Sequence, residues 1–324
     1  MMKARLIGTG SFVPKKILTN YDLEKMVETS DSWISTRTGI RQRRVAVEDS
    51  TSEMAAKAAK AALKAAGVSP KEIDLIIVGT VTPDMTFPSS ACFVQSHLGV
   101  KSGAAAFDVS AACSGFLYAL DIANKYIKSG SVQKALVIGA DRFSRLVDWK
   151  DRSTCVLFGD GAGAVVLSAE KGNRGVLSSR IHSDGRHWEM LYADSPCPPS
   201  PFEKKGSGNH YLKMNGNETF KLAVRTMGSA IKEVMEETGL KPEDISLLIP
   251  HQANLRIINA ARDRLKLAEE KVFTNLDKYG NTSAGSIPIA LDEAVREGKV
   301  KDNDIILFVS FGGGLTWASA AVRW

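Results

Sequence analysis

The chain has 324 residues and a mass of 35.0 kDa, which corresponds to one large domain or two fused smaller ones. Hydrophobic residues make up 44% and charged residues 24%, a composition that supports a sizeable core and excludes disorder, collagen and coiled coil. The formal net charge of +6 suits either an ordinary solvated surface or an anionic ligand or acidic partner protein. No Lys/Arg-rich run with interleaved aromatic residues is present, so we expect no nucleic-acid partner.

We also expect neither export nor membrane insertion. No stretch approaches 18 consecutive apolar residues, and residues 1–14 lack the apolar region of a secretory signal. The cysteines form no C-x-x-C pair and are too sparse for a disulfide scaffold, which favours a reduced, cytoplasmic location. The five histidines lack metal-ligand spacing, and we predict no metal. The four cysteines are Cys92, Cys113, Cys155 and Cys197.

The first predicted element is a short apolar strand that ends in Gly8-Thr9-Gly10. This stretch lacks the third glycine and the following helix that a dinucleotide-binding fingerprint needs. A helical pattern then covers residues 52–66. Gly67 suits the C-cap of this helix, Pro70 ends it, and the apolar run to residue 77 predicts a buried strand.

Cys113 stands where a predicted strand runs into small residues and a helix begins. Apolar residues recur at helical spacing from Phe116 to Ile127, which predicts a central, buried helix. A cysteine in the first turn feels the positive end of the helix dipole, which lowers a thiol pKa and favours the nucleophilic thiolate. The alternative is a small buried hydrophobic residue, which is our interpretation of the other three cysteines.

The first half of the chain closes with a helix end, a glycine cap and a strand over residues 127–139. The glycine-rich stretch 158–163 precedes an apolar strand, so it is interpreted as a tight turn and not as a phosphate-binding loop. The proline-rich stretch Asp194–Gly208 predicts a long surface loop.

A second helical pattern covers residues 220–238, and a glycine, a proline, acidic residues and an apolar strand follow it over 239–249. His251 comes after this strand, at the end where α/β sheets place their ligand sites. Asn281 stands where the chain again turns into a helix of small residues. The alternatives are a core histidine with satisfied hydrogen bonds and an asparagine that caps a helix.

The second half therefore repeats the order of elements of the first. We expect a duplicated α/β unit with largely parallel sheets covered by helices, divided into domains 1–172 and 173–324. A pseudo-twofold axis would bring the helix starts at Cys113 and Asn281 together. The matching stretches are 67–77 with 239–249, 127–139 with 295–309, and 158–163 with 311–314.

Three short motifs resemble one family closely: Cys113 in Ala-Ala-Cys-Ser-Gly-Phe, His251 in Pro-His-Gln-Ala-Asn and Asn281 in Gly-Asn-Thr-Ser-Ala. The family is β-ketoacyl-acyl carrier protein synthase III, of the thiolase-like superfamily, and the resemblance runs the whole length of the chain. The Cys–His–Asn set separates this branch from the chain-elongating synthases, which use Cys–His–His, and from thiolases, which use a second cysteine. The resemblance implies a five-layered αβαβα fold of two duplicated halves and a homodimer.

The resemblance also implies the reaction. An acyl-CoA primer, acetyl-CoA or a short or branched one, would condense with malonyl-acyl carrier protein, giving 3-ketoacyl-acyl carrier protein, CoA and CO2 and initiating fatty acid biosynthesis. Cys113 would carry the acyl group, and its N–H and that of Gly313 would form the oxyanion hole. His251 and Asn281 would donate hydrogen bonds to the malonyl thioester. Loss of CO2 drives the bond formation, so no metal or other cofactor is expected.

Further residues are assigned to acyl-CoA by the same resemblance. Trp33, with Arg37 and Arg152, would hold the adenine, other residues would form the wall of the pantetheine tunnel, and Phe87 would reach across the dimer into the partner's acyl pocket. Each of them has a plainer alternative, either as a packing residue or as solvated surface. The full set is Trp33, Arg37, Phe87, Arg152, Leu191, Gly216, Phe220, Asn254 and Phe311.

An acidic carrier protein would bind a basic face formed by Lys221, Arg256 and Arg264. Asp263 departs from the adjacent basic residues that are frequent in the family at this place. Three other functions stay open on the sequence. They are a secondary-metabolite synthase or acyltransferase of the same fold, a cysteine hydrolase, and a non-catalytic protein that binds acyl carriers.

Overall fold

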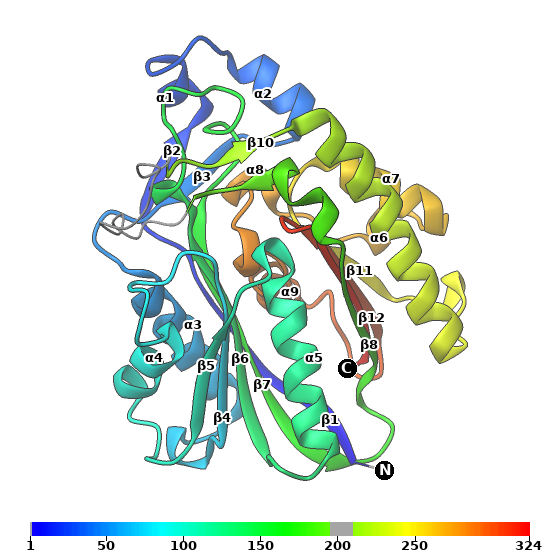
Figure 1. The fold of residues 1–324 in the computed structure, drawn as a ribbon. Helices are drawn as coiled ribbons and strands as arrows, with labels where there is room; N and C mark the ends of the chain where they lie inside the picture. The colour runs from blue at the N-terminus through cyan, green and yellow to red at the C-terminus, as the bar shows by residue number, and fades with distance from the viewer. Residues whose placement is uncertain (1, 195–209) are drawn as a thin grey trace.

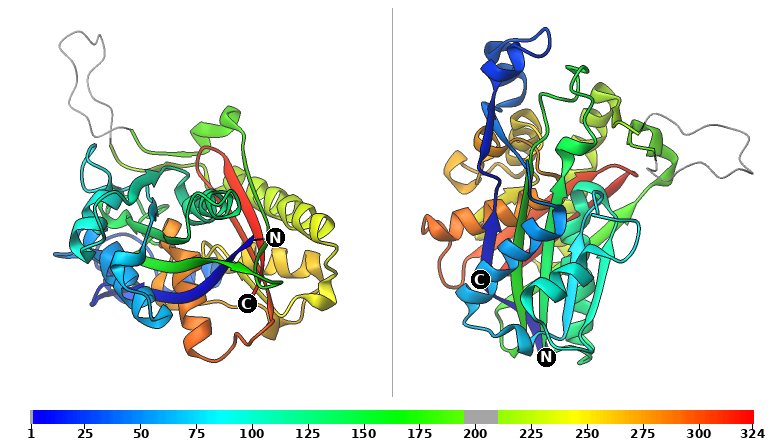
Figure 2. Two further views of the ribbon diagram at one scale, coloured as in Figure 1. Left: turned by 90° about the horizontal axis from the view of Figure 1, so that it is seen from below. Right: turned by 90° about the vertical axis from the view of Figure 1, so that its left-hand side faces the viewer.

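The fold was analysed in a computed structural model that describes residues 2–194 and 210–324 (Figures 1 and 2). The predicted surface loop, apart from Asp194, and Cys197 lie outside these residues. Two β-sheets form the centre of the molecule. The first has the order β1 (Met2–Phe12), β7 (Asp160–Lys171), β6 (Lys134–Arg142), β4 (Leu75–Gly79) and β5 (Ala105–Val109). The second has the order β11 (Leu247–Pro250), β12 (Ile305–Gly312), β13 (Thr316–Arg323) and β8 (Gly175–Ser183).

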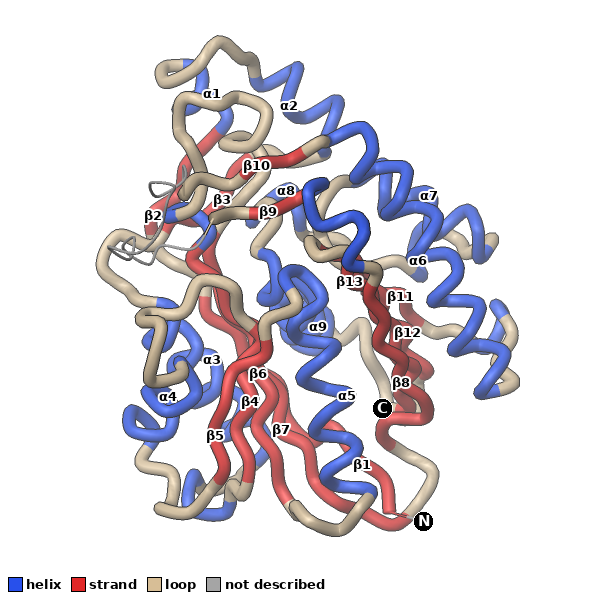
Figure 3. Tube along the Cα trace, in the orientation of Figure 1, coloured by secondary structure: helices blue, strands red, loops and turns tan. Residues whose placement is uncertain are grey.

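Helices form the other three layers (Figure 3). The helices α3 (Thr51–Ala66) and α4 (Ser90–Leu98) cover the outer face of the first sheet, and α6 (Gly216–Thr238) and α7 (Leu255–Leu265) cover that of the second. The helices α5 (Gly115–Lys128) and α9 (Ser286–Arg296) lie between the two sheets. The predicted five-layered α/β fold is therefore confirmed.

The apolar runs along the strands follow from this layering, because each strand is covered on both faces. In β4, Leu75 and Ile77 pack on the central helices, whereas Ile76 and Val78 pack on α3 and α4. Successive side chains of a strand point to opposite faces, so a strand between two helical layers needs apolar residues at every position. None of the helices in the described part of the chain is both long and apolar enough to cross a membrane.

The prediction of largely parallel sheets was wrong. Strands β4, β5 and β6 are parallel, as are β11 and β12, but β1, β7, β8 and β13 all pair antiparallel with their neighbours. The reason is the connection between strands. A tight turn over residues 313–315 joins β12 directly to β13, and a chain that returns without a crossover helix must run antiparallel.

The predicted duplication is visible element by element. Each half has an outer helix, a buried strand, a one-turn 3-10 helix leading into a central helix, and an antiparallel pair of strands. Gly67 and Gly239 both cap their outer helix in the left-handed conformation, with φ of 65° and 69°. The counterpart of β5 in the second half is reduced to a single bridge between Leu248 and Val272. The proposed boundary at residues 172 and 173 falls in the turn between β7 and β8, and the division into two domains stays a prediction.

The remaining elements are short and lie mainly near the ends of the strands. They are β2 (Lys16–Thr19), α1 (Asn20–Glu24), α2 (Asp31–Thr38), β3 (Gln42–Val45), β9 (Leu191–Tyr192), β10 (Lys213–Met214), α8 (Leu276–Tyr279), and the 3-10 turns η1 (Pro70–Glu72), η2 (Ala112–Ser114), η3 (Phe143–Arg145), η4 (Gly185–Met190), η5 (Pro242–Asp244), η6 (Glu269–Lys271) and η7 (Ser283–Gly285).

The starts of the two central helices meet in the middle of the molecule, as the pseudo-twofold predicted. A Cβ atom added to Gly115 would lie 3.3 Å from the Cβ of Ala284, and one added to Gly139 would lie 2.0 Å from the Ala284 carbonyl oxygen. A Cβ on Gly79 would lie 2.4 Å from the Gly115 carbonyl carbon. Glycines at these places allow backbone to pack directly on backbone.

We expect Gly139→Ala to lower the free energy of unfolding by about 2–3 kcal/mol, since the added methyl group meets backbone that cannot move aside cheaply. Urea denaturation of the purified variant measures this loss. Gly185→Ala is the matched control, because a Cβ there has no atom within 4 Å. Equal midpoints for the two variants would contradict the importance of this contact.

Candidate active site

Cys113 lies in η2, the single turn that leads into α5, and is 5% exposed. The turn is held in an unusual backbone conformation, because Ala112 has a φ of +47°. Gly312, at the end of β12, lies against the Cys113 backbone, since a Cβ there would come within 2.8 Å of the Cys113 nitrogen. The sulfur therefore sits at the start of a buried central helix, beside the end of a strand of the other half.

The helix dipole does not give Cys113 a lowered pKa, and that expectation was wrong. Burial raises the pKa of the Cys113 thiol to about 12, and the carboxylate of Asp141 acts in the same direction. Hydrogen bonding from the side chains of Ser283 and Asn281 favours the thiolate but only partly opposes the burial. The free site therefore holds a thiol at neutral pH.

Asn281 is held in place by both halves of the chain. Its N–H donates to the Leu157 carbonyl at 2.9 Å, and its carbonyl accepts from the Gly159 N–H at 3.0 Å. Its side-chain Oδ1 accepts from the Ser283 N–H at 2.8 Å, a contact like that of a helix cap. This bond assigns the oxygen of the amide, so the NH2 group is left to face Cys113. The Oδ1 atom of Asn281 thus acts as in a helix cap, as the alternative interpretation expected, while the NH2 group of the same side chain faces Cys113, as the site interpretation expected.

His251 follows β11 directly and is 3% exposed. Its N–H donates to the Val309 carbonyl at 2.8 Å, which ties it to β12, the strand that ends beside Cys113. Its Nδ1 lies 2.6 Å from the Ser286 hydroxyl. Burial lowers the pKa of His251 to about 3, so the imidazole is neutral at physiological pH. A neutral ring can donate a hydrogen bond without acting as a strong acid.

Asp141 is a buried residue of this region that the sequence interpretation missed. Its Oδ1 accepts hydrogen bonds from Thr80 and Thr82 and from the Val81 N–H, at 2.8–3.2 Å, and its Oδ2 accepts from the Ala284 N–H at 3.1 Å. Burial raises the pKa of Asp141, while these donors favour its carboxylate. A lone Asp at a strand end has no sequence pattern that reveals such a cluster.

The predicted oxyanion hole is only partly located by these contacts. Gly312, which we did not single out, lies beside Cys113, because a Cβ on Gly312 would come within 2.8 Å of the Cys113 nitrogen. Gly313, the predicted member, lies against Leu191, because a Cβ on Gly313 would come within 2.6 Å of the Leu191 carbonyl oxygen. Leu191 thus borders the loop 312–314. Phe311 is 6% exposed and packs in the core between the second sheet and its outer helices.

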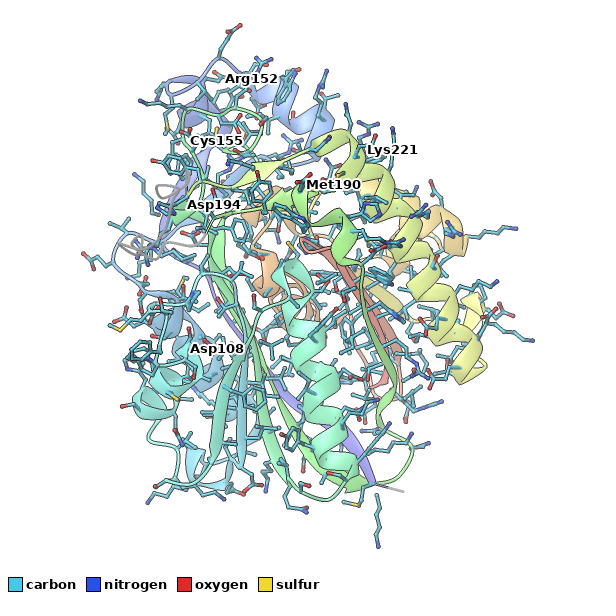
Figure 4. All side chains as sticks on the ribbon, in the orientation of Figure 1. Asp108, Arg152, Cys155, Met190, Asp194 and Lys221 are labelled. Atoms are coloured by element: carbon cyan, nitrogen blue, oxygen red, sulfur yellow. The ribbon has the colours of Figure 1, made fainter. Side chains whose placement is uncertain are left out.

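The residues predicted to bind adenine do come together. The Arg37 guanidinium lies 4.9 Å and that of Arg152 5.4 Å from the ring centre of Trp33. Arg152 also donates to the Glu28 carbonyl at 2.8 Å, and Figure 4 shows it at the same end of the molecule as Lys221. Asn254 caps α7 and donates from Nδ2 to the Arg37 carbonyl at 3.1 Å, so it links this group to the helices of the second half.

The other predicted binding residues lie on or beside α6 and α7. Gly216 is the first residue of α6, and the Arg256 guanidinium lies 5.1 Å from the ring centre of Phe220. Arg264 crosses α6 at Gly228, where a Cβ would lie 2.5 Å from its side chain. Lys221 is exposed and pairs with Glu218, and Asp263, the departure from the family pattern, pairs with Arg262.

Phe87 is not joined to this group within one chain. It is 83% exposed, in the loop that leads into α4.

As for metals, the described residues hold no cluster of three His, Cys, Asp or Glu side chains that could bind an ion. The absence of a metal and of a cofactor stays a prediction.

The chain is similar to known proteins over its whole length. Residues 107–185 match the family model described as 3-oxoacyl-[acyl-carrier-protein] synthase III, and residues 235–324 match its C-terminal model. The β-ketoacyl-[acyl-carrier-protein] synthase III of Aquifex aeolicus is 54% identical over 323 residues, which cover 100% of both chains. Its crystal structure matches with a TM-score of 0.93, covering 99% of this chain and 100% of that one.

A second solved structure is the priming β-ketosynthase of the R1128 polyketide biosynthetic pathway, which is 36% identical with a TM-score of 0.92. It covers 99% of this chain and 96% of its own. The full-length identity to synthase III enzymes decides against a hydrolase and against a non-catalytic carrier-binding protein. The chain therefore belongs to the β-ketoacyl-[acyl-carrier-protein] synthase III family, the acyltransferases whose condensing reaction initiates fatty acid biosynthesis.

Proposed function

We propose that Cys113, His251 and Asn281 carry out the two half-reactions of this family at the junction of α5 and α9. The substrates are an acyl-CoA primer and malonyl-acyl carrier protein. The observation that carries this proposal is the convergence of a buried thiol, a neutral imidazole and an oriented amide on the two helix starts.

In the first half-reaction Cys113 attacks the acyl-CoA carbonyl. The new bond joins the sulfur to the acyl carbon, the bond to the CoA sulfur breaks, and the thiol proton leaves with CoA. The N–H groups of Cys113 and Gly313 stabilise the oxyanion formed on the way. Because the thiol has a raised pKa, its proton is lost during the attack and is not already absent from the free enzyme.

In the second half-reaction His251 and Asn281 donate hydrogen bonds to the malonyl thioester carbonyl. Loss of CO2 leaves an enolate whose negative charge develops on that oxygen, and its carbon attacks the acyl carbon on Cys113. The new C–C bond replaces the bond between the acyl carbon and the Cys113 sulfur, which leaves as thiolate and takes up a proton from solvent to restore the thiol. Two neutral donors suit this step. A cationic imidazole would protonate the carbanion, and an aspartate in place of Asn281 would repel its charge.

The residues near the molecular surface would hold the CoA thioester. The adenine would stack against Trp33, next to Arg37 and Arg152, which already lie over the ring. Pantetheine would pass Asn254, Gly216 and Phe220 on its way to Cys113. The acyl chain would end against Leu191, Phe311 and a Phe87 contributed by the partner subunit.

Carrier protein would bind next to this entrance. Lys221, Arg256 and Arg264 come from α6 and α7 and form a basic face suited to an acidic partner. Asp263 does not remove this charge alone, because it already pairs with Arg262. The face formed by Lys221, Arg256 and Arg264 thus keeps a net positive charge.

We further propose a homodimer in the cytoplasm. The described strands leave β5 as the edge of the first sheet, and an unpaired edge is a natural site for pairing with a second copy. The exposed Phe87 precedes α4, which packs beside this edge. Sedimentation of the purified chain at the mass of a monomer would contradict the dimer.

The described cysteines Cys92, Cys113 and Cys155 are free thiols, which suits a reducing compartment.

We expect Cys113→Ala to abolish acylation, seen as loss of the acyl mass gain after mixing with acetyl-CoA or isobutyryl-CoA. His251→Ala and Asn281→Ala should keep the mass gain but slow CO2 release from malonyl-acyl carrier protein by about 100-fold or more, because each removes a donor to the enolate. Intact-protein mass spectrometry and a decarboxylation assay separate the two steps. The reverse pattern would overturn the role assignment.

The raised pKa of Cys113 predicts its reactivity in the free enzyme. Its alkylation by iodoacetamide should rise about tenfold per pH unit from pH 7 to 10 without a plateau, since the thiolate fraction grows until the pH reaches about 12. Mass spectrometry of the peptides measures each cysteine separately, and the exposed Cys92 serves as an internal control for the reagent. A plateau below pH 9 would show that the thiolate is stabilised in the free site.

Reversing a charge on the basic face should weaken carrier binding alone. We expect Lys221→Glu to raise the KM for malonyl-acyl carrier protein by about tenfold at low salt and less at high salt, with the KM for acyl-CoA unchanged. Lys60→Glu is the matched control, because Lys60 is exposed on α3 at the opposite outer layer. Equal effects of the two variants would remove the basic face from the docking site.

A further inference from the structure

Ser286 is the first residue of α9 and is 2% exposed. Its Oγ lies 2.6 Å from Nδ1 of His251 and accepts a hydrogen bond from the Gln252 N–H at 3.3 Å. One hydroxyl thus contacts both the imidazole and the backbone that carries it. No other residue of the described chain shares a hydrogen bond with this imidazole ring.

The hydrogens around this hydroxyl can be assigned. A backbone N–H only donates, so the bond from Gln252 uses a lone pair of the Ser286 oxygen. The proton of the hydroxyl then needs an acceptor, and within residues 2–194 and 210–324 the only one at hydrogen-bond distance is Nδ1 of His251. If Ser286 donates to Nδ1, the single proton of a neutral imidazole must be on Nε2.

The segment around His251 is too firmly held to offer another arrangement. Gln252, 1% exposed, donates from its amide to the Pro250 carbonyl at 2.7 Å and accepts from the Asn275 N–H at 3.0 Å. The His251 N–H is bound to Val309. These bonds hold the backbone on which the imidazole is carried, next to Ser286.

We propose that Ser286 is a positioning residue that fixes His251 in the tautomer with its proton on Nε2. The ring then presents a donor to the thioester carbonyl of the malonyl group. The inference rests on the proposed function, because it specifies which hydrogen of His251 that function uses. Ser286 touches neither substrate and acts only through the imidazole.

Loss of this role should affect the two half-reactions differently. Acylation of Cys113 uses no hydrogen of His251, whereas stabilisation of the enolate does. Without the Ser286 hydroxyl, the proton of the imidazole can also be held on Nδ1. In those molecules Nε2 presents a lone pair, and not a hydrogen, to the thioester carbonyl. Decarboxylation should then suffer and acylation should not.

The direct test is the 15N spectrum of His251 in protein labelled at the histidine ring nitrogens, assigned by its loss in His251→Ala. Wild type should show a protonated Nε2 and an unprotonated Nδ1. In Ser286→Ala the Nδ1–H form should become populated. The decarboxylation rate should fall by about tenfold or more, while the acylation rate and the KM for malonyl-acyl carrier protein stay within twofold.

Two variants serve as controls. Ser286→Thr keeps the hydroxyl and should restore most of the rate and the tautomer. Ser319→Ala removes another buried hydroxyl, that of a β13 residue, which donates to the Ala230 carbonyl at 2.8 Å. This variant should leave the decarboxylation rate and the tautomer of His251 unchanged. A purely structural role for Ser286 would slow acylation and decarboxylation equally.

The outcomes can be told apart. If His251→Ala blocks decarboxylation but Ser286→Ala does not, the inference fails and the proposed function stands. If His251→Ala has no effect on decarboxylation, the proposed function itself fails. Should Ser286→Ala not fold, the wild-type spectrum still decides, since a proton on Nδ1 would overturn the inference.

Discussion

The close contact between the starts of α5 and α9 is the constraint on which the rest of the molecule depends. Backbone packs on backbone there because Gly115 of α5 and Gly139 of β6 have no side chain and Ala284 adds only a methyl group. The contact brings Cys113 of the first half beside the polar loop of the second. A larger residue at either glycine would separate the thiol from its partners even if each half folded well.

The chemistry of the site follows from its burial. Removal of water keeps the Cys113 thiol protonated and the His251 ring neutral, so the free enzyme holds no charge in the catalytic set itself. In the proposed reaction, charge is formed only while substrate occupies the site, as an oxyanion or an enolate, and it is stabilised by fixed N–H donors. A site of neutral donors thus stabilises the transition state more than it stabilises its own resting state.

The duplicated order of elements and the three candidate polar residues could be predicted from the sequence because each has a local pattern, whereas the five layers were implied by the family resemblance. Glycine caps, apolar runs and small residues before a helix are all visible within a dozen positions. Strand direction was not predictable, because it depends on whether a connection crosses the sheet. The pKa of Cys113 was predicted with the wrong sign, since the dipole is a local property and burial a global one. Asp141 and Ser286 were missed because their partners are remote in sequence.

Asp141 has one more consequence, for folding cooperativity. Its carboxylate is shared, with donors from the Thr80–Thr82 loop of the first half and from Ala284 of the second, and it is fully buried. If the second half unfolded alone, this buried carboxyl group would lose the Ala284 donor and part of its cover at once, and a buried polar group without its partner costs free energy. The shared carboxyl group therefore favours joint unfolding of the two duplicated halves, because separating them leaves its hydrogen bonds incomplete.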